Sequence, residues 1–185
     1  MNLIERDLRH IWHPCSQMKD YEVFKPIIIK KAYGPYLETD NGKRIIDAIS
    51  SWWCKSLGHN HPALKAALFE QAEKFEHVIL ANTTNEMIVK LSEKLSKLTK
   101  NLDKVSFASD GSCAVEIAMK MSLHAHQLKG QAQRTTFMAL ENAYHGETAA
   151  TLSVSDLSLY NKPYQSLMFD TVFIKGLPYV TGKDD

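Results

Sequence analysis

The sequence predicts an α/β protein, with a small antiparallel β segment near the N-terminus followed by an incomplete, mainly parallel sheet with helices. The first observation is the dipeptide Asn41-Gly42 between two short apolar runs, which favours a tight hairpin because both central positions of the turn need φ > 0. The second is the alternation of strand-like and helix-like stretches from residue 104 onward. We therefore expect two parts: residues 1–60, with a helix and the antiparallel segment, and residues 61–185, the beginning of a larger sheet domain.

Each expected element follows from the spacing of its apolar residues. Apolar residues at helical spacing predict helices over 3–12, 62–75 and 85–99, and a long helix that follows the turn at 109–112 and ends at about 129. Short β-branched and aromatic runs predict a meander over 22–48 and strands at 104–108, 134–140 and 171–174. The order strand, helix, strand predicts a right-handed crossover and parallel strands. A further βα unit begins after residue 174 without its helix, so we expect the chain to be part of a longer protein.

Composition and charge exclude several classes of protein. Lys and Arg number 22 and Asp and Glu 21, so a formal net charge of +1 gives no broad field to attract nucleic acid or an anionic membrane. No apolar run reaches the roughly 18 residues of a membrane span, and the N-terminus does not resemble a secretory signal. The three cysteines are far apart, which argues against a disulfide framework and a structural zinc site. We therefore expect a cytoplasmic globular protein.

The strongest local signal is the turn Ser109-Asp110-Gly111-Ser112 between a predicted strand and a predicted helix. The free N–H groups of the first helical turn, together with the helix dipole, form a site for an anion. Gly111 would let a phosphate approach the backbone, and the Ser112 hydroxyl would donate to it. The alternative is that Asp110 or Ser112 only caps the helix. Neither GxGxxG nor GxxxxGK[ST] occurs here, so no dinucleotide site or P-loop is predicted.

A second candidate segment, Asn142-Ala143-Tyr144-His145-Gly146, follows the predicted strand 134–140. Ligands of open parallel sheets bind beyond the carboxyl ends of the strands. This loop should therefore open into the same crevice as Gly111-Ser112 and place an aromatic face beside the phosphate. The alternative is a half-packed Tyr144 and a capping His145.

Two adjacent tryptophans, Trp52 and Trp53, form a third candidate. Neighbouring side chains of a strand face opposite sides, so both cannot easily be core, whereas a loop that lines a pocket would use both. The alternative is one core and one interface tryptophan. Pairs of histidines with metal-like spacing also occur, but none has a well-placed companion ligand, so no metal site is predicted. These pairs are His10 and His13, His59 and His61, and His124 and His126.

Taken together, these motifs resemble the class-III, fold-type I pyridoxal-phosphate aminotransferases, the class that includes ornithine and 4-aminobutyrate aminotransferases. The motifs of the wider class are Asp40-Asn41-Gly42, Gly58-His59-Asn60-His61-Pro62, Gly111-Ser112 with Ala114 and Glu116, and Tyr144-His145-Gly146. Three stretches narrow the resemblance to the branch that acts in biotin synthesis, namely residues 10–14, 50–53 and 114–121. The similarity extends from Arg9 to Phe173.

The resemblance implies an activity and a set of site residues. That branch transfers an amino group from S-adenosylmethionine to 8-amino-7-oxononanoate through pyridoxamine phosphate. By this resemblance, the pyridoxal phosphate would be bound by Gly111, Ser112, Cys113, Tyr144 and His145, with Tyr144 against its ring. The substrate pocket would be lined by Trp52, Trp53, Tyr144 and Cys15, and Cys15 stands where the family most often has a tyrosine.

The resemblance also implies that two catalytic groups of the family lie outside residues 1–185. The Schiff-base lysine of the family, and the aspartate that pairs with the pyridine nitrogen, would lie beyond Asp185. The 185-residue chain alone therefore resembles a fragment and should be inactive. The family forms homodimers with active sites at the subunit interface. Two alternatives stay open: another class-III ω-aminotransferase with a different donor, and a non-catalytic binding protein built on this half-domain.

Overall fold

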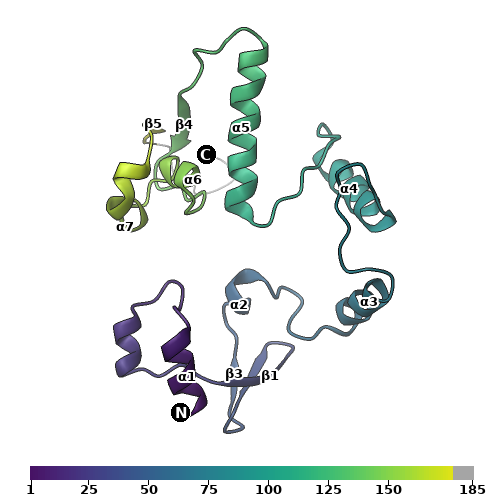
Figure 1. Ribbon diagram of the computed structural model, residues 1–185, viewed down its shortest axis with the longest axis vertical. Coiled ribbons are helices and arrows are strands. Elements are labelled where there is room, and N and C mark those ends of the chain that lie inside the picture. Colours follow the sequence, from purple (N-terminus) through teal and green to yellow (C-terminus); the bar gives the residue numbers. More distant parts are fainter. Residues whose placement is uncertain (177–185) are drawn as a thin grey trace, which may run out of the picture. The chain divides into compact units, whose positions relative to one another are not determined.

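The computed structural model describes residues 1–176, which form two compact units divided between Thr84 and Asn85 (Figure 1). The boundary expected between residues 60 and 61 lies inside the first unit. Residues 177–185, on which the expectation of a further βα unit depends, lie outside the described residues.

The first unit contains a three-stranded antiparallel sheet in the order β1-β2-β3, which confirms the predicted meander. Its strands are β1 (Ile29–Tyr33), β2 (Tyr36–Thr39) and β3 (Arg44–Ile46). The β2–β3 hairpin turns at Asn41-Gly42 as predicted, but only Gly42 has a positive φ, of +79°. Asn41 does not, and four residues separate the strands, so the turn is not the expected type with φ > 0 at both central positions. The sheet begins later than the expected residue 22, because residues 18–22 form a short helix and Pro26 has no N–H to donate to a ladder.

Four helical segments complete the first unit: α1 (Leu3–His10), the 3₁₀ helix η1 (Met18–Glu22), α2 (Ser50–Trp53) and α3 (Pro62–Ala72). A capping box begins α1, since the Asn2 side chain accepts from the Glu5 N–H and the Glu5 carboxylate accepts from the Asn2 N–H, both at 2.9 Å. Pro62 occupies the first turn of α3, as the sequence predicts.

The second unit contains a two-stranded parallel sheet and several helices. In chain order its elements are α4 (Glu86–Thr99), α5 (Gly111–Leu128), β4 (Phe137–Leu140), α6 (Ala149–Ser153), α7 (Ser158–Asn161), the 3₁₀ helix η2 (Lys162–Leu167) and β5 (Thr171–Ile174). Phe137 lies opposite Thr171 and Leu140 opposite Ile174. The predicted parallel pairing of these strands and the predicted helices α4 and α5 are therefore confirmed.

The prediction of a strand at residues 104–108 is wrong for the described part of the chain, where this segment is neither helix nor strand. A strand is defined by its partner, and among residues 1–176 no backbone hydrogen bond links this segment to a neighbour. Three short helices between β4 and β5 were not predicted, because helices of four to six residues are too short to show a helical period.

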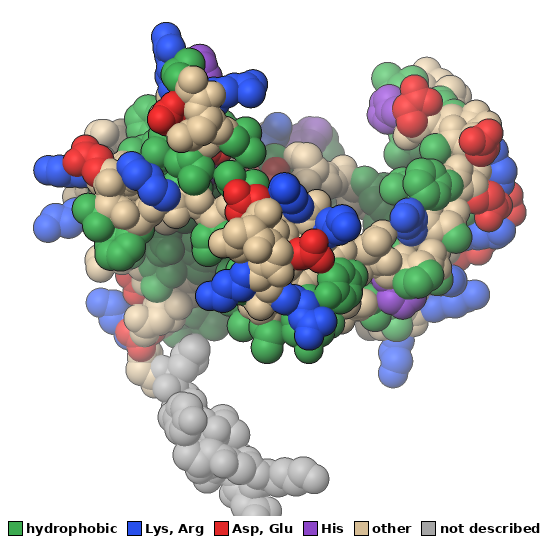
Figure 2. Space-filling model, turned by 90° about the horizontal axis from the view of Figure 1, so that it is seen from below, with side chains coloured by type: hydrophobic (Ala, Val, Ile, Leu, Met, Phe, Trp, Pro, Cys, Tyr) green, Lys and Arg blue, Asp and Glu red, His purple; other side chains and the backbone are tan. Residues whose placement is uncertain are grey.

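Few apolar side chains are buried. Within residues 1–176 the buried hydrophobic residues are Ala139, Leu152 and Val154, and the fully buried polar side chains gather between Thr151 and Ser155. Figure 2 shows apolar side chains reaching the surface among charged ones on one face. The best-packed part of the second unit is therefore α6 with the two residues after it, and the candidate loop is hydrogen-bonded to this segment. No helix in the described part of the chain is long and apolar enough to cross a membrane.

Candidate functional site

The N-terminus of α5 and the loop after β4 lie against each other. Gly146 is buried with a φ of +133°, and a Cβ at this position would collide with the Ser112 hydroxyl and lie 2.8 Å from Thr151 Oγ1. Only a residue without a Cβ lets the loop approach so closely. The structure thus brings together the Gly111-Ser112 turn and the Tyr144-His145-Gly146 loop, the two segments expected to share a crevice.

Asp110 caps α5, so the capping role left open by the sequence is observed. Its Oδ1 accepts from the Cys113 N–H at 2.8 Å, and Ser109 Oγ donates to its Oδ2 at 3.1 Å. These hydrogen bonds, led by the Cys113 N–H and with a smaller contribution from the Ser112 N–H, lower the pKa of the Asp110 carboxyl. An anion at this turn would therefore share the N–H groups of Ser112 and Cys113 with a charged carboxylate.

The backbone of the candidate loop is tied to the buried segment on both sides of Tyr144. Asn142 N donates to Asp156 Oδ2 at 3.1 Å, and Asp156 N donates to the Ala143 carbonyl at 2.9 Å. His145 N donates to the buried Ser155 Oγ at 2.9 Å. The loop conformation is therefore fixed by the protein before any ligand binds.

Tyr144 is half exposed, at 52%. Its hydroxyl donates to Glu147 Oε1 at 3.0 Å, and its ring centroid lies 5.8 Å from that of Tyr160. The side chain of His145 is also exposed. Both side chains are thus exposed on the loop whose Gly146 contacts Ser112.

This site is held in place by two groups of residues to which the sequence analysis assigned no role. Glu116 Oε1 in α5 accepts from the Ala150 N–H at 3.1 Å, which ties α5 to α6. Ser155 Oγ donates to the Thr151 carbonyl at 2.8 Å, and Ser153 Oγ donates to that of Ala149 at 2.8 Å. The run of hydroxyl residues from Thr151 to Ser155 was the only sequence signal of this network, and hydroxyl residues are common in exposed loops too.

In the first unit, Trp52 and Trp53 lie on a left-handed turn. Ser50, Ser51, Trp52 and Trp53 have φ values of 50°, 46°, 64° and 66°. The two tryptophans are 59% and 79% exposed, with ring centroids 5.8 Å apart. Among the described residues both tryptophans are therefore exposed, and their place in a substrate pocket stays a prediction.

A cluster of polar side chains lies next to this turn. Asp47 Oδ2 accepts from Ser51 Oγ at 2.7 Å and lies 2.7 Å from His59 Nε2. The Ser51 N–H, then the Ser51 hydroxyl and His59, lower the pKa of Asp47 to about 2. His59, one of the histidines considered as metal ligands, is thus engaged with a carboxylate.

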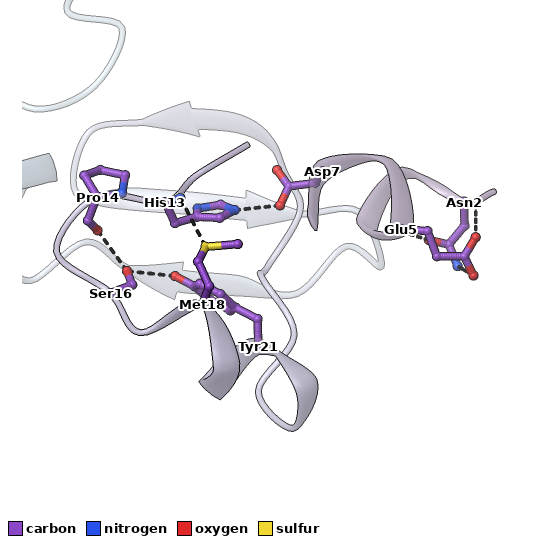
Figure 3. A network of polar contacts seen from close by, with 8 residues as sticks. All are labelled: Asn2, Glu5, Asp7, His13, Pro14, Ser16, Met18 and Tyr21. Atoms are coloured by element: carbon purple, nitrogen blue, oxygen red, sulfur yellow. Dashed lines mark hydrogen bonds and ion pairs between the residues drawn. The ribbon is translucent and has the colours of Figure 1, made fainter. Parts of the chain in front are cut away.

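Cys15 is exposed in a turn of its own, with a φ of +51°. Hydrogen bonds hold the residues around it: His13 Nε2 lies 2.6 Å from Asp7 Oδ2, and Tyr21 donates to Ser16 Oγ at 3.0 Å (Figure 3). Cys15 therefore lies on a structured turn, with its side chain exposed.

Two further histidines of these pairs have different surroundings. His61 occupies the N-cap position of α3, but its side chain makes no capping hydrogen bond, and its buried Nδ1 has no hydrogen-bond partner among the described residues. His126 Nδ1 lies 2.8 Å from Gln131 Oε1. Within residues 1–176, no three His, Cys, Asp or Glu side chains gather as a metal-binding group.

The fold and these motifs are those of the class-III aminotransferases, and the chain belongs to this family, whose sequence model matches residues 17–182. Within this family, similar relatives share the name of one enzyme. The adenosylmethionine-8-amino-7-oxononanoate aminotransferase of Helicobacter pylori is 46% identical over 168 residues, which is 90% of this chain and 38% of the relative. The enzyme of the same name from Aquifex aeolicus is 37% identical over 179 residues, 96% of this chain and 39% of the relative.

Solved structures agree with the sequence comparison. The crystal structure of adenosylmethionine-8-amino-7-oxononanoate aminotransferase from Methanocaldococcus jannaschii matches with a TM-score of 0.88 and 37% identity, over 92% of this chain and 39% of that one. An omega transaminase from Pseudomonas jessenii in complex with PMP matches with a TM-score of 0.84 over 94% of this chain and 39% of that one, but at 24% identity it shows the fold alone. The predicted family and fold class are confirmed, and the chain spans 38–39% of the length of these relatives.

Proposed function

We propose that the protein carrying this chain is a pyridoxal-phosphate-dependent aminotransferase of biotin synthesis, which transfers the amino group of S-adenosylmethionine to 8-amino-7-oxononanoate. The observation that carries the proposal is the close approach of Gly146 to Ser112, because it joins a helix N-terminus and an aromatic loop in one place. The names of relatives that are 33–46% identical support the choice of substrates.

The second unit fits the phosphate and the ring of the cofactor. The N-terminus of α5 offers N–H groups, the Ser112 hydroxyl and the positive end of an 18-residue helix, all of which favour a phosphate. Because Asp110 already accepts from the Cys113 N–H, we assign the larger share of phosphate binding to Gly111 and Ser112. Tyr144 would lie against the ring, with His145 beside it.

Pyridoxal phosphate, when bound, supplies the electron sink that amino-group transfer needs. The residues of this chain would bind the cofactor and orient it. The fixed backbone around Tyr144 would keep its ring in one place, and the contact of the Ser112 hydroxyl with Gly146 would hold that hydroxyl in position. The lysine that the family uses is expected beyond Asp185.

Side chains of the first unit fit the substrates. Trp52 and Trp53 offer apolar wall to the long carbon chain of 8-amino-7-oxononanoate and an aromatic face to the cationic donor. We assign Cys15 to the same pocket. The cysteine cannot supply the hydroxyl of the tyrosine usual in the family, so this contact with the substrate would be apolar or weakly polar.

The test is amino transfer by the intact protein with pyridoxal phosphate, 8-amino-7-oxononanoate and a panel of donors. We expect diaminopelargonate from S-adenosylmethionine and little from ω-amino acids. Transfer from ω-amino acids alone would favour another class-III aminotransferase. Absence of transfer from every donor, with pyridoxal phosphate unbound, would favour the non-catalytic binding protein.

We also propose a homodimer in the cytoplasm. Large apolar side chains are exposed in both units, as expected of surfaces that a partner covers. All three cysteines are free, which fits a reducing compartment. Sedimentation equilibrium of the intact protein tests the dimer, and fractionation of the cell tests the location.

A further inference from the structure

The turn that carries the two tryptophans is strained. Four successive residues, Ser50 to Trp53, have positive φ and none is glycine. In an L-residue this conformation brings the Cβ close to the following carbonyl oxygen, so it is adopted by single residues more readily than by runs. A run of four persists only if the surrounding structure holds it.

The surrounding structure includes a polar cluster of Asp47, Ser51 and His59. The side chains of Asp47 and His59 are only 6% and 11% exposed. Asp47 Oδ2 accepts from Ser51 Oγ, inside the turn, and pairs with His59 Nε2, both at 2.7 Å. The backbone adds a bond from Ser50 N to the Asp47 carbonyl at 3.2 Å. Asp47 thus links the strained turn to His59.

His59 is itself fixed to the turn between β1 and β2. Its N–H donates to the Gly34 carbonyl at 2.8 Å, and the Gly34 N–H donates to the His59 carbonyl at 3.0 Å. Gly58 has a φ of +80°, and a Cβ there would lie 3.0 Å from Gly34 Cα, so the two backbones are in close contact. The polar cluster therefore joins the tryptophan turn to the antiparallel sheet.

We propose that Asp47 and His59 are positioning residues, which hold the left-handed turn so that Trp52 and Trp53 face the carbon chain of the amino acceptor. The proposal rests on the proposed function, in which these two indoles line the acceptor pocket. Asp47 and His59 act through the turn and need not touch the substrate, because their own side chains are nearly covered.

The first measurement does not depend on any substrate. Two indoles with centroids 5.8 Å apart and planes tilted by 56° couple electronically and give a paired circular-dichroism band. The difference between the spectra of the intact parent protein and its Trp53→Phe variant isolates this band. We expect His59→Ala and Ser51→Ala each to reduce the band by half or more.

His59→Gln is the conservative variant, because its amide nitrogen can still donate to Asp47, and it should keep most of the band. Glu70→Gln is the matched control: Glu70 forms an exposed ion pair with Lys74 at 3.3 Å in the same unit, and its loss should leave the band unchanged. If His59→Ala fails to fold, Ser51→Ala and His59→Gln still decide the question. An undiminished band in Ser51→Ala, or equal loss in Glu70→Gln, would overturn the proposal.

The second measurement is steady-state kinetics with 8-amino-7-oxononanoate. We expect His59→Ala to raise the apparent KM for this acceptor at least fivefold, with kcat within twofold, and His59→Gln to restore it. A lost band with an unchanged KM would overturn the link between the turn and the substrate. If the parent transfers no amino group to this acceptor, the proposed function fails, while the spectra still decide whether Asp47 and His59 hold the turn.

Discussion

Replacing Gly146 by alanine should destabilise the second unit and weaken binding of the cofactor together. A Cβ at this position would lie 2.8 Å from both Ser112 Cβ and Thr151 Oγ1, and Thr151 is fully buried and has little room to move. Overpacking of this kind costs about 1–3 kcal/mol. Adopting a φ of +133° with a side chain costs a further amount of about 1–3 kcal/mol, so the total is about 2–6 kcal/mol.

Displacement of Ser112 should also remove one charge-assisted hydrogen bond to the phosphate, which is worth about 1.5–3 kcal/mol, or about a 10- to 150-fold loss of affinity. Urea unfolding of the intact protein measures the first effect, and titration with pyridoxal phosphate measures the second. Gly130→Ala is the control for backbone strain, because Gly130 has a φ of +72° and open space around a Cβ. If Gly146→Ala and Gly130→Ala lower the free energy of unfolding equally, the contact with Ser112 is not as close as we describe.

Four further outcomes are expected. Ser112→Ala should weaken binding of pyridoxal phosphate several-fold or more without changing the free energy of unfolding, and equal affinity would remove Ser112 from the phosphate site. Tyr144→Phe should keep the cofactor bound but change the kinetics with substrate, whereas Tyr144→Ala should damage both; full transamination by Tyr144→Ala would make the residue structural. Trp52→Ala should raise the apparent KM for 8-amino-7-oxononanoate by an amount worth about 1–3 kcal/mol, and lost folding with normal kinetics in the surviving protein would point to a structural role. Hydrogen bonds lower the pKa of Asp47 from 3.8 to about 2, so its contribution to stability should be complete above pH 3.8 and be lost as the pH falls toward 2. The difference between the free energies of unfolding of the parent and of Asp47→Asn should therefore shrink as the pH falls over that interval.

Elements with a local chemical cause were predictable from the sequence. The position of the hairpin follows from Gly42, which has a positive φ, although Asn41 does not share it, and α5 follows from its cap and its length. The parallel pairing of β4 with β5 follows from the order of elements. The strand expected at residues 104–108 was not predictable in this way, because a strand needs a partner and an apolar run does not reveal whether one is present.

The candidate site also contains residues with a local sequence signal and residues without one. Glycine and serine at the start of a helix predict an anion site from the sequence alone, so Gly111 and Ser112 were candidates, and their binding of phosphate stays a prediction. The polar cluster of Asp47, Ser51 and His59 could not, because it joins residues up to 12 positions apart through a turn of the wrong hand for L-residues. No sequence pattern predicts four consecutive positive φ angles without glycine.

The two sheets should form at different times as the chain is synthesised. The meander joins neighbouring strands through turns of two to four residues, so it can form as soon as Ile46, the last residue of β3, has left the ribosome. The parallel pair must wait for the whole connection between Leu140 and Thr171, and until then β4 has an unpaired edge. Ribosome-bound chains that end shortly before Thr171 should therefore depend on chaperones more than chains that end after Ile174.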